Sequence, residues 1–135
     1  MEMNITFPGN KRVNAEFGGF TVETDQPRGA GGGDASAPAP FDVFLASIGT
    51  CAGIYALGFM QQREIPTEGM RLRLITQRDP QTHMVGKITL DLQLPPEFPE
   101  KYREAVVKAM DLCAVKRHIA QPPEFEITTA IGSHP

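Results

Sequence analysis

The sequence predicts an α+β fold in which antiparallel sheets pack on one long central helix. Residues 43–60 carry no charge and are apolar on every face of a helix. Residues 71–77 and 87–94 alternate polar and apolar side chains, as half-buried strands do. A looser alternation over residues 4–25 precedes the helix. With 135 residues, the chain has room for one core, so we predict a single domain over residues 1–135.

The region before the helix divides into two parts. Residues 1–25 are predicted to form a hairpin or a three-stranded meander, because Pro8-Gly9-Asn10 and Gly18-Gly19 supply turn conformations. Residues 26–39 are mostly Gly, Ala, Ser and Pro, which predicts a flexible arm. The arm lacks both glycine motifs that cradle phosphates, so it is interpreted as a linker.

The central helix is expected to begin at Pro40 and to end at the polar residues 61–64. Proline is favourable at a first helical position, and Asp42 lies near the positive end of the helix dipole. A membrane span is the rival interpretation, since the stretch is long and apolar. Its many small residues, the missing aromatic belt and the alternating strands that follow favour a soluble protein without a membrane partner.

The remaining core completes the segment 40–135. The two alternating stretches after the central helix predict an antiparallel hairpin. A second helix is expected from Pro99, with an apolar stripe that leads to Cys113. A short helix or turn over residues 114–120 and a final strand near residues 125–131 follow.

The apolar surface of the central helix predicts a homodimer. One sheet and one further helix leave part of that surface uncovered, and a second copy of the chain is its simplest partner. Gly49 and Gly53 would allow two copies of the helix to approach closely, while the arm wraps around the neighbour.

The composition argues against several other kinds of protein. A net charge of −3 and a pI near 5.6 disfavour nucleic acid as a partner. Residues 1–10 show no export signal, so a cytoplasmic location is expected. His83, His118 and His134 are too scattered for a zinc site, and no metal is expected.

Cys51 and Cys113 are the only cysteines, and they carry the functional question. In a reducing compartment they are either inert core thiols or partners in transient redox chemistry. Asp42 would lie on the opposite face of the helix from Cys51, about 13 Å away along the axis, so nothing local lowers the Cys51 pKa. The basic residues 116–118 could instead stabilise a thiolate at Cys113. Both helices bury their apolar faces in one core, which could bring the two thiols together.

Residues 40–51, PFDVFLASIGTC, resemble the cysteine helix of the OsmC/Ohr family, P-x-x-L-hydrophobic-A-A-x-x-x-C. Cys113 falls where that family keeps its second cysteine. The resemblance covers most of the chain and fits the less characterised OsmC-like subgroup better than Ohr. It implies an OsmC-like fold and an intertwined homodimer with two active sites at its interface.

The resemblance also implies a thiol-dependent peroxidase that reduces organic hydroperoxides. Cys51 would attack the peroxide as a thiolate and become a sulfenic acid, which Cys113 would resolve as a disulfide. An external dithiol, lipoyl-type in the better known branches, would then reduce the pair, without metal or bound cofactor. The alternative is a non-enzymatic dimeric module that binds a small apolar ligand, with both cysteines as core packing.

The chain departs from the family pattern beside the reactive cysteine. The peroxidase branches pair that cysteine with an Arg from the meander and a Glu directly after the helix-opening proline. Phe41 occupies the Glu position here, with Asp42 next to it. Arg12 in the meander and Arg28 in the arm are the candidate arginines. Without a clear cation partner, a buried Cys51 is expected to have a raised pKa and to react slowly.

Overall fold

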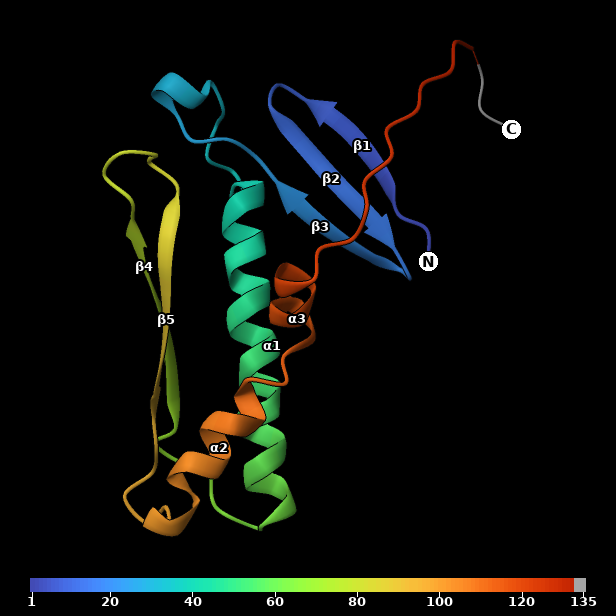
Figure 1. Ribbon diagram of the computed structural model, residues 1–135. Coiled ribbons are helices and arrows are strands. Elements are labelled where there is room, and N and C mark those ends of the chain that lie inside the picture. The colour runs from blue at the N-terminus through green and yellow to red at the C-terminus, as the bar shows by residue number, and fades with distance from the viewer. Residues whose placement is uncertain (133–135) are drawn as a thin grey trace.

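A computed structural model describes residues 1–132 as two antiparallel sheets and three α-helices, and it confirms the α+β class (Figure 1). The long helix α1 lies between the two sheets, with the shorter helices beside its lower half (Figure 1). The elements in chain order are β1 (Asn4–Gly9), β2 (Arg12–Phe17), β3 (Phe20–Thr24), the 3-10 turn η1 (Gly29–Gly31), α1 (Pro40–Gln62), β4 (Arg71–Arg78), β5 (Val85–Gln93), the 3-10 turn η2 (Glu100–Tyr102), α2 (Arg103–Met110) and α3 (Ala114–Ala120).

Helix α1 begins at Pro40, as the sequence predicts, and ends at Gln62. The buried residues of α1 include Ala52 and Ala56, whose small side chains let α2 pack closely against the helix. Met60 is also fully buried near the end of the helix. The core shared by α1 and α2 consists of Ala52, Ala56, Phe59, Val106 and Met110.

Only part of α1 is covered within one chain. Ile54 is 59% exposed, and Phe41 and Phe44 near the start of the helix are exposed as well. Within residues 1–132, α1 is the one helix long and apolar enough to cross a membrane by length and composition alone, and 28% of its most apolar window is buried. The uncovered face of α1 therefore has no packing partner within residues 1–132.

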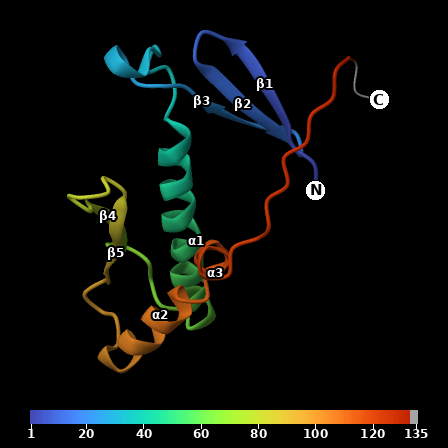
Figure 2. The same cartoon turned by 45° about the horizontal axis from the view of Figure 1, so that its top comes forward.

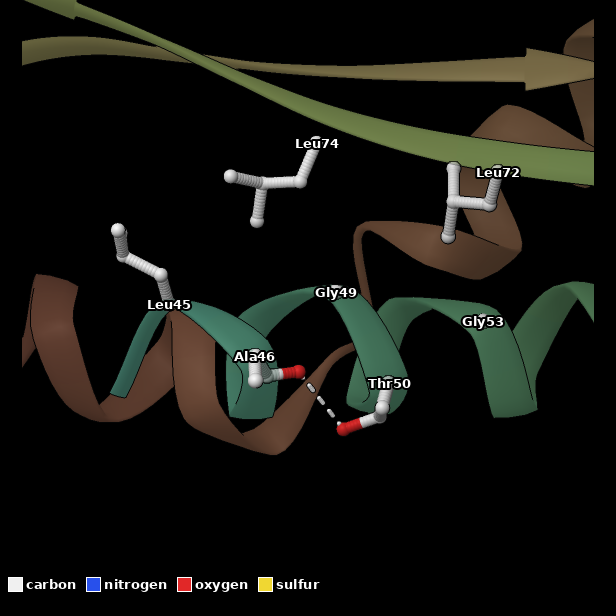
Figure 3. A pocket seen from close by; sticks show the side chains of 7 residues that line it. All are labelled: Leu45, Ala46, Gly49, Thr50, Gly53, Leu72 and Leu74. Atoms are coloured by element: carbon white, nitrogen blue, oxygen red, sulfur yellow. Dashed lines mark hydrogen bonds between the residues drawn. The ribbon is translucent and has the colours of Figure 1, made fainter. Parts of the chain in front are cut away.

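Gly49 and Gly53 lie against a sheet of their own chain, a neighbour that the sequence analysis did not assign to them. They face β4 of the same chain, where an added Cβ would lie 3.6 Å from Leu74 and from Leu72, respectively. Figure 3 shows both leucines pointing from β4 toward this side of α1, around a hollow of about 480 Å³. The small residues therefore let the helix lie close to its own sheet.

The two predicted strand regions are confirmed as antiparallel units. Strands β1, β2 and β3 form a meander in that order, and the Gly18–Gly19 turn uses positive φ angles that favour glycine. Strands β4 and β5 pair as a hairpin in which Leu72 lies opposite Leu92. The inward-facing leucines of this hairpin pack against the core of α1 and α2.

The glycine-rich arm, residues 26–39, is folded rather than free. Asp25 is fully buried, and its carboxylate accepts hydrogen bonds from the backbone N–H groups of Gln26, Asp34 and Ser36 and from the Ser36 hydroxyl. These bonds, above all the one from the Ser36 hydroxyl, lower the pKa of Asp25 to about 2. The sequence analysis missed this role because each donor except one is a main-chain group.

The Asp25 carboxylate is expected to make stability depend on acid pH. The unfolded carboxyl takes up its proton near its ordinary pKa of 3.8, whereas the folded one stays ionised down to about pH 2. Its contribution is therefore complete above about pH 4 and is lost as the pH falls through about 2. Urea unfolding at pH 5 and pH 2.5 should show a smaller loss of stability in Asp25→Asn than in the wild type.

Glu23→Gln on the exposed side of β3 is the matched control, since it removes a carboxylate that holds no part of the arm. Its acid sensitivity should equal that of the wild type. An Asp25→Asn variant that loses stability in acid as steeply as the wild type would contradict this assignment.

The predicted final strand, residues 125–131, is wrong for the single chain. The segment is not part of any sheet among residues 1–132 and runs away from α3 (Figures 1 and 2). Phe125, Ile127 and Ile131 are 83%, 93% and 108% exposed. Alternation indicates a strand, but a strand forms only where an edge is available to pair with it.

Candidate active site

Cys51 and Cys113 come together where α1 meets the start of α3. Cys51 lies in the middle of α1 and is partly exposed, whereas Cys113 is only 1% exposed. Both cysteines are free, and the Cys113 thiol is close enough to Cys51 to influence its pKa. The shared core thus brings the cysteines together, as the sequence analysis considered.

Cys113 lies between α2, which ends at Met110, and α3, which begins at Ala114. The Cys113 N–H still donates to the Met110 carbonyl of α2, at 3.2 Å. Its own carbonyl accepts from the Arg117 N–H at 3.0 Å, in the first turn of α3. With φ −48° and ψ 122°, Cys113 is the cap residue of α3, so the free N–H groups of the next two residues lie near Cys51.

The surroundings of Cys51 favour its thiolate. Its pKa is lowered first by the backbone N–H of Val115, then by the Cys113 thiol, with smaller contributions from the Ala114 N–H and the charge of Arg117. Partial burial opposes these effects but does not cancel them. The expectation of a raised pKa for Cys51 was therefore wrong, because main-chain donors take the place of a cationic side chain.

The surroundings of Cys113 have the opposite effect. Burial raises its pKa, and so does the adjacent Cys51. The basic residues that follow are engaged elsewhere: Lys116 pairs with Asp111, and Nδ1 of His118 donates to a main-chain carbonyl of α3 at 2.6 Å. The idea that residues 116–118 hold a thiolate at Cys113 is thus overturned.

The two thiols differ in the direction of their pKa shifts and in their burial, and these differences indicate how each could react. A thiol with a lowered pKa and partial exposure is the better nucleophile toward an electrophile from solvent. A buried thiol that stays protonated suits the second step, in which it attacks the oxidised neighbour. By this criterion the surroundings favour Cys51 over Cys113 as a nucleophile.

The other candidate residues lie apart from this pair in the single chain. Arg12 is exposed at the start of β2, and Asp42 is exposed in the first turn of α1. Arg28 donates from Nε to the Asp34 carbonyl within the arm, at 3.1 Å. In the described part of the chain, none of these three is among the main causes of the lowered pKa of Cys51. Across the same residues, no three His, Cys, Asp or Glu side chains gather as metal ligands.

The charge of Arg117 also lowers the pKa of Cys51, and the sequence analysis did not assign Arg117 to that thiol. Replacing Arg117 with Gln is expected to raise the Cys51 pKa and modestly slow its alkylation by iodoacetamide at pH 7. Peptide mass spectrometry resolves Cys51 from Cys113 in this assay. Arg103→Gln on α2, which removes an arginine paired with Glu100, should leave the rate unchanged. An unchanged rate in Arg117→Gln would show that the main-chain N–H groups act alone.

Comparison with known protein families decides the assignment of the fold. A family model described as OsmC-like protein matches residues 31–128. The chain belongs to the OsmC-like protein family. The match includes both cysteines and the whole of α1, and it confirms the resemblance seen in residues 40–51. No curated protein matches the sequence.

Solved structures confirm the OsmC-like fold. An OsmC like protein from Mycoplasma pneumoniae is 12% identical, with a TM-score of 0.69, and the match covers 90% of this chain and 87% of that one. A Psychrobacter arcticus protein, provisionally described as an osmotic stress induced and detoxification response protein, is 18% identical, with a TM-score of 0.71 and 85% of each chain covered. An organic hydroperoxide resistance protein OsmC from Legionella pneumophila is 20% identical, with a TM-score of 0.52 and 87% of each chain covered.

Proposed function

We propose that this OsmC-like protein is a thiol-dependent peroxidase that reduces organic hydroperoxides through Cys51 and Cys113. The observation that carries the proposal is the contact between a Cys51 thiol with a lowered pKa and a protonated, buried Cys113. Family membership supports a redox or peroxide-resistance role, and the Legionella pneumophila neighbour is named for organic hydroperoxide resistance.

The first step is attack by the Cys51 thiolate on one peroxide oxygen. The O–O bond breaks, and the alkoxide leaves as an alcohol after it takes up a proton, while Cys51 becomes a sulfenic acid. The N–H groups of Ala114 and Val115 stabilise the thiolate before the attack. Because they belong to a folded helix, they need not be reorganised when the peroxide arrives.

The second step joins the two sulfur atoms. The Cys113 thiol loses its proton and attacks the Cys51 sulfur, and the hydroxyl group of the sulfenic acid leaves as water. The proximity of the two thiols in the folded chain shortens the path to this disulfide. A dithiol reductant then supplies two electrons and restores both thiols, in the reducing environment that a cytoplasmic location would provide.

The proposed working form is a homodimer. A second copy would cover the exposed face of α1 around Ile54 and offer an edge to the unpaired segment 125–131. In that assembly Arg12, Arg28 and Asp42 are the supporting residues that we propose, because the dimer would bring side chains of both copies to the interface.

The test is to count free thiols while reduced protein meets substoichiometric cumene hydroperoxide or hydrogen peroxide. The proposal predicts rapid loss of two thiols per chain for each peroxide consumed, faster with the organic peroxide. Release of one equivalent of alcohol should accompany the loss. Slow or single-thiol loss with both oxidants would contradict the proposed cycle and leave the fold without this chemistry.

A further inference from the structure

Two sulfur ligands meet at the contact between α1 and α3. Cys51 lies in the middle of α1, and Cys113 lies at the start of α3, which packs beside α1 in both views (Figures 1 and 2). Both cysteines are free. Cys113 is buried, whereas Cys51 is partly exposed. A single small ion can therefore reach the pair from the side of Cys51, although a bulky molecule has no access to Cys113.

The side chains around this pair offer sulfur rather than oxygen or nitrogen as ligands. Within residues 1–132, no third His, Cys, Asp or Glu joins the two cysteines to form a group of metal ligands. Nδ1 of His118 is engaged with the Ala114 carbonyl, and the Asp111 carboxylate is paired with Lys116. Met110, whose thioether is a further soft sulfur, lines the same cavity as Cys113.

This set of ligands selects among metal ions. Zinc in proteins is held by three or four side chains in a tetrahedral arrangement, which the described residues do not supply here. Calcium and magnesium require several oxygen ligands. Copper(I) prefers soft thiolate and thioether sulfur, and its filled d shell accepts two thiolates in a linear arrangement. Two adjacent thiols without hard ligands therefore match copper(I) best.

We propose that the Cys51–Cys113 pair, with both thiols free, binds one copper(I) ion between its two sulfur atoms. Each thiol releases one proton as its sulfur bonds to the ion, and neither the sulfur nor the metal is oxidised or reduced. The complex carries one negative charge, because two thiolates outweigh a single positive ion. The N–H groups of Ala114 and Val115 and the charge of Arg117 act on Cys51 and would stabilise that charge.

Copper(I) would be a competitor of peroxide at this site and not a cofactor. Both sulfur atoms would be bonded to the ion, so neither would be available as a nucleophile. The inference goes beyond the proposed function and does not depend on it, since it needs only the two free thiols. Copper binding and peroxide reduction can therefore be tested separately.

Anaerobic titration of the reduced protein with copper(I) tests the site, with bathocuproine disulfonate as a coloured competing chelator. One ion should bind per chain, with loss of two free thiols, and X-ray absorption of the wild-type complex should show sulfur neighbours alone. Cys51→Ser and Cys113→Ser should each weaken binding at least about 100-fold, more than the loss of an outer-shell partner costs. Oxygen or nitrogen neighbours of the metal, or wild-type affinity in either serine variant, would overturn the proposal.

His118→Gln is the matched control, because it removes a possible metal ligand of α3 whose ring is already engaged. It should bind copper(I) with the affinity of the wild type. A large loss of affinity in this variant would show that the ion is held by the histidine and would contradict a site made of the two thiols.

Protection from alkylation tests the selectivity for copper. One equivalent of copper(I) should slow the reaction of Cys51 with iodoacetamide at least about tenfold, and one equivalent of zinc should not. Equal protection by both ions would overturn the selectivity. Copper-free protein that binds copper(I) as expected but loses no thiols to hydroperoxide would count against the proposed function alone.

Discussion

Replacing Cys51 with serine is expected to abolish hydroperoxide reduction, with a fall in turnover of at least about 10³-fold. A serine hydroxyl stays protonated at neutral pH and cannot become a sulfenic acid. The N–H groups of Ala114 and Val115 would then face a neutral oxygen in place of a thiolate. Turnover is measured as loss of cumene hydroperoxide in the presence of excess dithiothreitol.

Cys113→Ser is the variant that separates the two steps. It should consume one peroxide per chain, stop at the sulfenic acid of Cys51 and be labelled by dimedone at that residue. Hydroperoxide turnover that persists in Cys51→Ser would remove the basis of the peroxidase proposal. It would favour the alternative of a ligand-binding dimer in which both thiols pack the core.

The second large effect is expected in the C-terminal segment. Changing Phe125 and Ile127 together to Asp should convert the proposed dimer to monomer, with the dissociation constant raised at least about 100-fold. Both side chains are almost fully exposed in the single chain and alternate with polar residues. Pairing with a second copy would bury them on one face of a sheet. Sedimentation velocity over a range of protein concentrations measures the change.

Thr128→Asp combined with Ala130→Asp is the control for this experiment. It adds the same charge to the opposite face of the segment, which a pairing strand would turn to solvent. The control should therefore stay dimeric. Dimers that tolerate aspartates at Phe125 and Ile127 would show that the segment has no part in assembly.

Most of the architecture could be predicted from the periodicity of apolar residues. The bounds of α1, the β4–β5 hairpin and the N-terminal meander follow from patterns within each segment. The strand over residues 125–131 could not be assigned correctly for one chain, because alternation does not say which edge a strand pairs with. The neighbour of Gly49 and Gly53 within the chain could not be predicted either, since a small residue indicates close approach without identifying the neighbouring element.

Only part of the candidate site could be predicted from the sequence. The two cysteines could be identified from the sequence because they are the only ones in the chain. The core shared by both helices also indicated that the two thiols could lie close together. The order of their pKa values could not be read from the sequence, because the strongest influence on Cys51 is a backbone N–H that any residue at Val115 except proline would supply. The folded conformation of the arm could not be predicted for the same reason, since Asp25 holds the arm mainly through hydrogen bonds from main-chain N–H groups of the arm.

The placement of the thiolate's stabilising groups in the main chain has an evolutionary consequence. Positions 114 and 115 can accept almost any amino acid without loss of the N–H groups beside Cys51. If the proposed function holds, selection would act on the path of the backbone and on the two cysteines more than on the side chains at positions 114 and 115. A reactive centre of this kind can persist through extensive sequence divergence, and its ancestry is better traced by comparing folds than by comparing residues.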